Sequence, residues 1–128
     1  MWFDASLQDA WTNGFYPAIR AAGFRPVRID REEYVGSVSD EIMAEIRRSS
    51  FLVADYTGHR NGVYFEAGFA AGRGLTVIPT CRASDMDNLH FDIRHLNTLR
   101  WITPDDLASA LEARIRAVIG AGADADPP

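Results

Sequence analysis

Phe51-Leu52-Val53-Ala54-Asp55-Tyr56-Thr57-Gly58, followed closely by Val63-Tyr64-Phe65-Glu66-Ala67-Gly68-Phe69-Ala70-Ala71-Gly72, is the clearest structural signal in the chain. Residues 51–54 form a continuous apolar run of the kind that a central strand of a parallel sheet requires. Residues 56–62 are rich in turn-forming residues, and residues 63–72 predict a helix rich in small side chains. A strand, a polar loop and a helix in this order are typical of an α/β protein.

The same alternation extends outward in both directions. Toward the N-terminus we expect strands at residues 2–3 and 26–29, a helix at 7–22 that Gly23 ends, and a helix from Asp40 with Ile42, Met43 and Ile46 on its buried face. Toward the C-terminus we expect strands at 75–80 and 98–102, a polar connection at 83–95 and a helix at 105–119. The predicted fold is a single-domain flavodoxin-like doubly wound parallel sheet over residues 1–119. It has about five strands in the order 2-1-3-4-5 and a disordered tail at 120–128.

That strand order predicts where a ligand would bind. The chain reverses direction between the first and third strands, and ligands bind beyond the carboxyl ends of such strands. The two loops that follow them are residues 4–6, with Asp4 and Ser6, and residues 55–62. These loops are the expected binding region.

Composition excludes several classes of protein. The chain has 128 residues, a formal net charge of −5 and no lysine among its 13 basic residues. Without lysine, a P-loop ATPase and any Schiff-base or pyridoxal mechanism are excluded, and we expect no cofactor. The acidic balance disfavours a nucleic-acid duplex as partner. Because no apolar run could span a bilayer and no secretion leader is visible, we expect a cytoplasmic protein that makes no use of a membrane.

A metal site is not expected either. Cys81 is the only cysteine, and its position at the end of an apolar run predicts a buried structural thiol. His90 and His95 lie five residues apart in a loop, a spacing that matches no zinc motif. Asp92 and Arg94 between them can form an ion pair that holds the loop.

Glu66 is the only charged residue in the segment 63–72. A carboxylate surrounded by Tyr64, Phe65 and Phe69 would be partly desolvated, which suits a nucleophile or a general acid or base. The alternative is an exposed glutamate in the first turn that stabilises the helix dipole. Gly68 and Gly72 favour the functional interpretation, since they are expected to bring the helix close to the sheet.

The loop before this helix has two interpretations of its own. Asp55 could bind a sugar hydroxyl, a metal or a loop amide, or it could organise the loop through a turn toward Thr57 or Gly58. The following residues supply backbone amides, a guanidinium group and a helix N-terminus, which together favour an anion such as phosphate. The expected binding residues here are Gly58, Arg60, Asn61 and Gly62.

Residues 51–58, 61–70 and 77–78 together resemble the nucleoside 2-deoxyribosyltransferase superfamily. The shared pattern is an apolar strand ending in Asp55, a short polar loop, the motif E-x-G-x-A that begins at Glu66, and a second apolar strand. The likeness extends from Met1 to about Trp101 and includes Asp92-Ile93-Arg94-His95.

The resemblance implies a mechanism. In that superfamily the glutamate of the motif attacks the anomeric carbon and expels the base, and either a second base or water then accepts the sugar. Carried over, Glu66 is the nucleophile. In our leading hypothesis Asp55 and Asp92 are partners of the sugar or the leaving group. The superfamily also sends an asparagine into the site of a neighbouring subunit. Asn88 stands at a matching distance before the last strand, which implies a homo-oligomer.

Two departures from the superfamily pattern bear on the substrate. Arg60 stands where the transferases have an acidic residue, and a guanidinium group there would suit a phosphorylated substrate. The tyrosine that orients the nucleophile in relatives comes from the first strand and has no clear counterpart here, so Tyr64 is the available substitute.

We therefore expect cleavage, by hydrolysis or transfer, of the N-glycosidic bond of a (deoxy)nucleoside or nucleoside 5′-monophosphate. Two alternatives remain. One is a non-catalytic module that binds or senses nucleotides, and the other is a Toll/interleukin-receptor-like NAD hydrolase. Trp11, Phe15 and Tyr16 are more apolar than an exposed helix needs, which supports a dimer or a higher homo-oligomer.

Overall fold

The computed structural model describes residues 5–28, 40–58, 61–88 and 97–123. The chain divides into two compact units, one made of residues 1–3 and 29–100 and the other of residues 4–28 and 101–128. The single domain expected over residues 1–119 stays a prediction.

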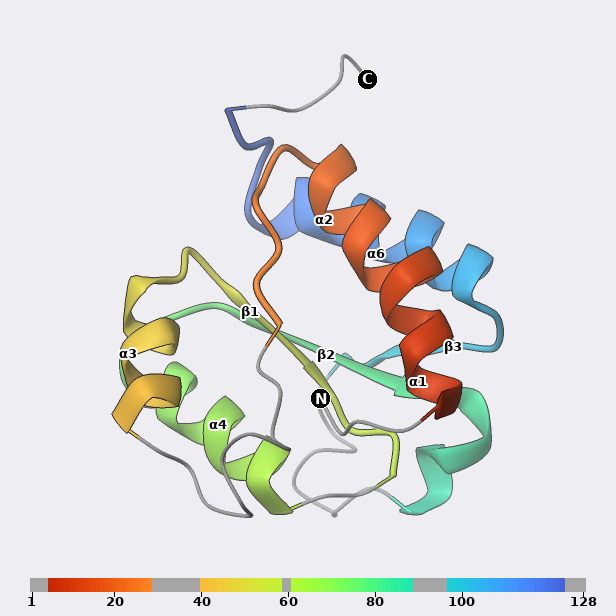
Figure 1. Cartoon of the computed structure of the whole chain (residues 1–128), viewed down its shortest axis with the longest axis horizontal. Coiled ribbons are helices and arrows are strands. Elements are labelled where there is room, and N and C mark those ends of the chain that lie inside the picture. Colours follow the sequence, from red (N-terminus) through yellow and green to blue (C-terminus); the bar gives the residue numbers. More distant parts are fainter. Residues whose placement is uncertain (1–4, 29–39, 59–60, 89–96, 124–128) are drawn as a thin grey trace. The chain divides into compact units, whose positions relative to one another are not determined.

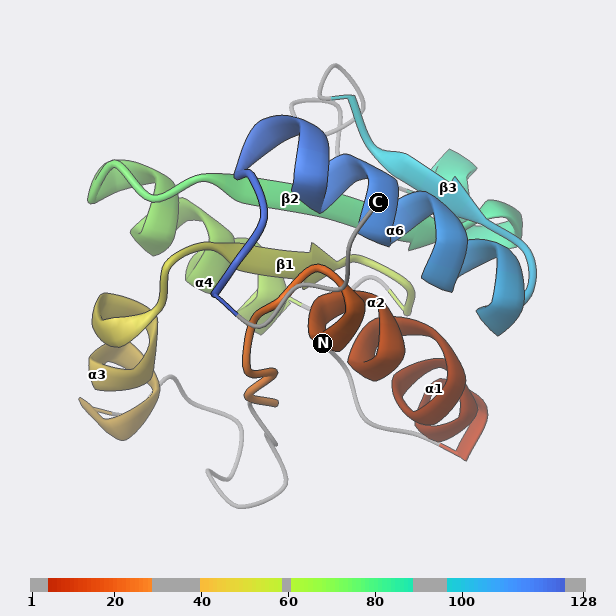
Figure 2. The same ribbon diagram turned by 90° about the horizontal axis from the view of Figure 1, so that it is seen from above.

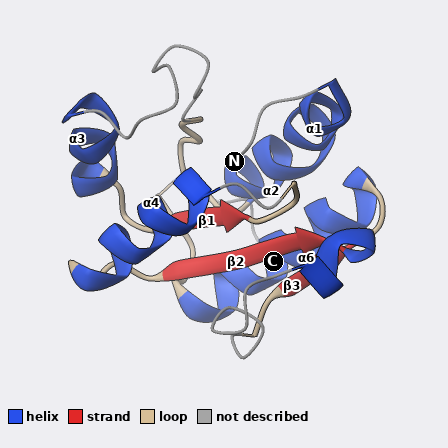
Figure 3. Cartoon of the chain, turned by 90° about the horizontal axis from the view of Figure 1, so that it is seen from below, coloured by secondary structure: helices blue, strands red, loops and turns tan. Residues whose placement is uncertain are grey.

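A small parallel sheet lies in the first unit, apart from Trp101, the last residue of its third strand. Its strands are β1 (Leu52–Asp55), β2 (Val77–Arg82) and β3 (Leu99–Trp101), in the order β1-β2-β3. Leu52 pairs with Val77, and the register continues to Asp55 opposite Thr80. Figure 3 shows β1 and β2 as arrows that point the same way. The α/β class is confirmed, and the three strands lie within about two residues of the predicted third, fourth and fifth.

The order 2-1-3-4-5 is not confirmed, because the described residues form three strands. The strand predicted at 26–29 is wrong for residues 26–28, which have no regular structure, and Ile29 lies outside the described residues. Val27 is 50% exposed, so the short apolar pattern there is not buried as a strand of a doubly wound sheet would be. The strand predicted at residues 2–3 also lies outside the described residues.

Two helices accompany the sheet in this unit. Helix α3 (Asp40–Arg48) has acidic residues in its first turn and arginines in its last, as its sequence predicts from the helix dipole. Its buried residues Ile42 and Ile46 pack with Ala70 of α4 (Asn61–Gly72), whereas Met43 is only half-buried. Helix α4 also contacts β1 and β2, and Figure 2 shows it along one face of these strands. A short 3-10 helix, η3 (Ala83–Asn88), follows β2 and occupies part of the predicted polar connection.

The second unit is helical. One continuous helical segment comprises α1 (Ala5–Ala10), the π-helical turn η1 (Trp11–Phe15) and α2 (Tyr16–Ala21). It ends at Gly23, whose φ of 98° fits the predicted glycine stop. This segment packs against α6 (Pro104–Val118), and the two lie side by side in Figure 1.

The apolar residues of this helical segment are mostly core residues rather than an exposed surface. Phe15 is buried, and its ring lies 6.4 Å from that of Trp101. Trp11 is half-buried and contacts Tyr16 edge-on at 5.8 Å, so Tyr16 is the one fully exposed member of the three residues expected at an interface. Gly14 allows the close approach of α6, because a Cβ atom there would lie 2.7 Å from a methyl carbon of Leu107.

Helix α6 begins and ends with defined caps. Thr103 and Asp106 form a capping box at its N-terminus, and Gly120, with φ of 101°, follows its last turn. Beyond it, the Gly122 amide donates a hydrogen bond of 2.8 Å to the Ala22 carbonyl. The Gly120 amide also donates to the Ile115 carbonyl at 3.1 Å, so the predicted tail at 120–128 has backbone hydrogen bonds within its described residues, 120–123.

Candidate functional site

A buried carboxylate closes β1. Asp55 is 1% exposed, and its two carboxylate oxygens accept hydrogen bonds from the Thr57 amide at 3.1 Å and from the Thr80 hydroxyl at 2.6 Å. The first bond is the turn toward Thr57 that the sequence offered as one interpretation of Asp55. The second bond ties the ends of β1 and β2 together. Asp55 thus has an observed structural role, and a role in catalysis stays a prediction.

The three residues after Asp55 are also held by β2 and η3. The Tyr56 amide donates to the Thr80 carbonyl at 2.9 Å, and the Thr57 hydroxyl accepts from the Arg82 amide at 2.8 Å. The Gly58 amide donates to the Asp85 carboxylate at 2.9 Å. We call this set of residues the β1 clasp: Asp55, Tyr56, Thr57 and Gly58 on one side, and Thr80, Arg82 and Asp85 on the other.

The β1 clasp changes the interpretation of Gly58. This glycine has φ of 84°, a conformation that few other residues adopt, so its place in the turn is well explained. Its amide was expected to help bind an anion. In the structure, the amide is bonded to a carboxylate of the same chain, and a phosphate would have to displace Asp85 to reach it.

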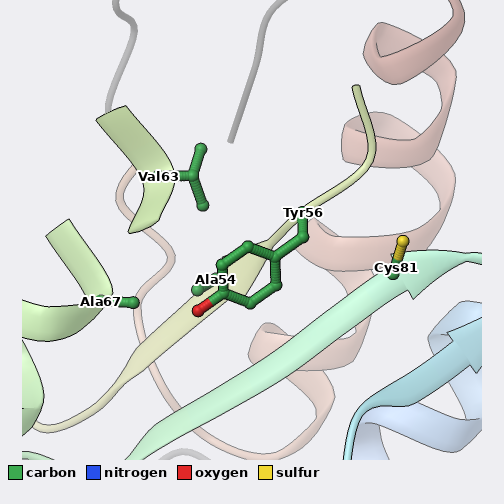
Figure 4. Close-up of a cluster of buried hydrophobic side chains, with 5 residues drawn as sticks. All are labelled: Ala54, Tyr56, Val63, Ala67 and Cys81. Carbon is green, nitrogen blue, oxygen red and sulfur yellow. The ribbon is translucent and has the colours of Figure 1, made fainter. Parts of the chain in front are cut away.

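The ring of Tyr56, a member of the β1 clasp, packs against a second aromatic ring and against buried apolar side chains. The rings of Tyr56 and Tyr64 are 4.7 Å apart, and Tyr56 packs with Ala54, Val63 and Ala67, as Figure 4 shows. Burial, with a smaller contribution from Tyr64, raises the pKa of Tyr56 to about 12. Tyr56 therefore keeps its proton near neutral pH and can act as a hydrogen-bond donor.

Cys81 is fully buried, as the sequence predicts. Burial and then the charge of Asp55 raise the pKa of its thiol to about 12, although a hydrogen bond to the Thr57 side chain opposes the rise. A thiol with this pKa is protonated near neutral pH, so Cys81 is a poor nucleophile.

Glu66 lies on the buried face of α4. The buried residues Val63, Ala67 and Ala70 recur at the spacing of one helix face, and Glu66 belongs to the same stripe. Its side chain is 3% exposed, and the first turn of α4 contains no acidic residue. The alternative of an exposed first-turn glutamate is therefore wrong. α4 starts at Asn61, two residues earlier than predicted, so Glu66 lies further into the helix.

The aromatic surroundings predicted for Glu66 are only partly correct. Phe65 is 55% exposed, so it does not shield the carboxylate. Phe69 packs with Ile42, Ile46 and Ala70 in a separate cluster, while Tyr64 packs against Tyr56. What buries Glu66 is its position on the sheet-facing side of α4.

The role predicted for Gly68 and Gly72 is wrong. Both are exposed, and a Cβ atom added at either would meet nothing within 4 Å. These glycines therefore do not bring α4 close to the sheet. Helix α4 approaches the sheet through the small buried residues Ala67 and Ala70 instead.

This finding makes Gly68→Ala a stabilising substitution. Alanine in an exposed helix interior is more favourable than glycine by about 0.5–1 kcal/mol, and Gly68 has open space around it. Urea unfolding should show that gain. Gly74→Ala is the matched control, since Gly74 is equally open but has φ of 82° and should lose stability on substitution. A lower free energy of unfolding in Gly68→Ala would mean that other residues pack over that side of α4.

The remaining predicted residues are only partly described. Asp4, Arg60 and Asp92 lie outside the described residues. Ser6 lies in α1, Asn88 ends η3, and Asn61 and Gly62 belong to the first turn of α4 rather than to the loop before it. The structure therefore brings together Asp55, Gly58, Tyr64 and Glu66 as residues at or beside the β1–α4 connection.

The sequence interpretation missed Thr80 and Asp85. Thr57 was expected only as a turn partner of Asp55, and Thr80 looked like the end of an apolar strand. Asp85 is one of several acidic residues after β2. A signal for Thr80 exists only once the register of β1 and β2 is known, because that register places it opposite Asp55.

Among the described residues, no three His, Cys, Asp or Glu side chains gather as they would around a metal ion. No described helix has both the length and the apolar character needed to cross a membrane. No protein-family model, curated protein or solved structure matches the chain.

Proposed function

We propose that this chain cleaves the N-glycosidic bond of a (deoxy)nucleoside or nucleoside 5′-monophosphate, with Glu66 as the nucleophile. The observation that carries the proposal is the carboxylate of Glu66, buried on the sheet-facing stripe of α4. A hydrophobic residue at that position would cost nothing in desolvation, whereas a carboxylate costs free energy that must be offset by its interactions. Buried ionisable groups of this kind are candidates for catalysis.

The proposed reaction proceeds in two steps. A carboxylate oxygen of Glu66 attacks the anomeric carbon as the bond from that carbon to the base nitrogen breaks, and the base leaves with the electron pair and takes a proton from an acid. The product is a glycosyl ester of Glu66. Water then attacks the same carbon and gives a proton to the conjugate base of that acid, which releases the sugar and restores both the Glu66 carboxylate and the acid; alternatively, a second base takes the place of water.

A panel of substrates tests the proposal. The protein is incubated with nucleosides, their 5′-monophosphates and NAD, and free base is measured by chromatography. Base released from a nucleoside or nucleotide is the expected result. Nicotinamide released from NAD alone would favour the NAD hydrolase alternative, and no release from any compound would contradict the proposal.

One observation favours a second candidate, a module that binds nucleotides without turnover. With 3% of its surface exposed, Glu66 offers little contact to a sugar in this conformation, and the carboxylate of Asp55 already holds the β1 clasp. This candidate predicts binding by calorimetry with no base release. It also predicts that Glu66→Gln binds as tightly as the wild type, whereas the enzyme predicts loss of turnover.

A further inference from the structure

The last hydrogen bond of the β1 clasp lies directly before α4. Gly58 donates its amide to Asp85, and only residues 59 and 60 separate Gly58 from the start of the helix at Asn61. Asp85 belongs to η3, 27 residues further along the chain. The bond thus holds Gly58, the last described residue before α4, from a separate element.

Glu66 lies on the face of α4 that packs against the β1 clasp. Val63 and Ala67, on either side of it along the buried stripe, belong to the same cluster as Tyr56 of the clasp. A shift of the clasp is therefore expected to shift the face of α4 that carries the carboxylate. A close-packed interior transmits such displacements rather than absorbing them.

We propose that Asp85 is a positioning residue for Glu66. It acts through the Gly58 amide, and its importance for catalysis rests on the glycosidic activity proposed above. The partly buried carboxylate of Asp85 accepts a charge-assisted hydrogen bond, which is stronger than a bond between neutral groups. Removing it leaves the Gly58 amide without that acceptor.

Hydrogen exchange tests the structural half of this proposal without any substrate. In Asp85→Ala, the amides of Gly58 and of residues 64–66 should exchange about tenfold faster, because the lost bond lowers the local opening free energy. Asp85→Asn should stay close to the wild type, since its amide oxygen can still accept the bond. Asp87→Ala is the matched control, an exposed aspartate in the same 3-10 helix. Asp85→Ser replaces Asp85→Ala if the alanine variant fails to fold.

Kinetics test the catalytic half. Asp85→Ala should lower kcat by about 10- to 100-fold, because a small misplacement of a reacting group has effects of this size. KM should change by less than about twofold, as expected when an interaction made in the transition state is lost. Asp85→Asn should recover most of kcat, and Asp87→Ala should retain all of it.

Each outcome has a separate meaning. Unchanged exchange at Gly58 and residues 64–66 in Asp85→Ala would overturn the positioning role, whatever the activity. Faster exchange with unchanged kcat would show that Asp85 anchors α4 without positioning Glu66, which also overturns the proposal. If the wild type releases no base, the proposed function fails, and the exchange data still decide whether Asp85 anchors the helix.

Discussion

Glu66→Gln is expected to abolish base release, with kcat reduced by about 10³-fold or more, because a carboxamide cannot serve as the nucleophile. Glutamine has nearly the same shape as glutamate, so the packing of α4 on the sheet should survive. Single-turnover assays measure the loss. Intact-mass measurement during turnover should show a sugar adduct on the wild type and none on the variant.

Two comparisons make this result specific. Glu41→Gln changes an exposed glutamate on α3 in the same way and should leave activity unchanged. Unfolding curves of wild type and Glu66→Gln should both show a cooperative transition, which separates loss of chemistry from loss of structure. Base release by folded Glu66→Gln at the wild-type rate would remove Glu66 from the mechanism.

Asp55→Ala is expected to lower the free energy of unfolding by about 2–6 kcal/mol, since each buried donor left without an acceptor costs about 1–3 kcal/mol. Two such donors are involved, the Thr57 amide and the Thr80 hydroxyl. A loss of this size is a large part of the stability of a small protein. Urea unfolding followed by circular dichroism gives the value.

A double-mutant cycle shows whether the loss comes from the bond between the strands. Thr80→Val removes the hydroxyl and keeps the shape, so Asp55→Ala combined with Thr80→Val should cost less than the sum of the single changes. The expected coupling is about 0.5–3 kcal/mol, as for other residues in one hydrogen-bond network. Asp87→Ala, an exposed control, should stay within about 0.5 kcal/mol of the wild type. Additive losses would mean that Asp55 stabilises the fold by other contacts.

Local patterns predicted the described strands and helices well. The apolar run before Asp55 became β1, and the acidic start and basic end of α3 matched the observed helix. Gly23 ended α2 in the left-handed conformation expected of it. These features depend on residues close together in the chain, so the sequence contains what is needed to predict them.

The candidate site was harder to predict, because helix α4 is apolar on nearly every side. Its residue pattern therefore does not show which face is buried. Phe65 looked like a shield for Glu66 and is exposed, whereas the small Ala67 and Ala70 form the contact with neighbouring elements. Gly68 and Gly72 lack side chains, and the sequence cannot show whether such residues face the sheet or solvent.

From the sequence alone came the α/β class and the buried thiol of Cys81, which depend on local composition and spacing; the sequence also supplied the hypothesis that Glu66 is a nucleophile, which stays a prediction. Tertiary structure decided the burial of Glu66 and the hydrogen bonds of Asp55 and Gly58. Asp55 meets Thr80 across 25 positions of sequence, and Gly58 meets Asp85 across 27. Such partners are chosen by strand register and by the path of the chain after β2, and no local pattern specifies either.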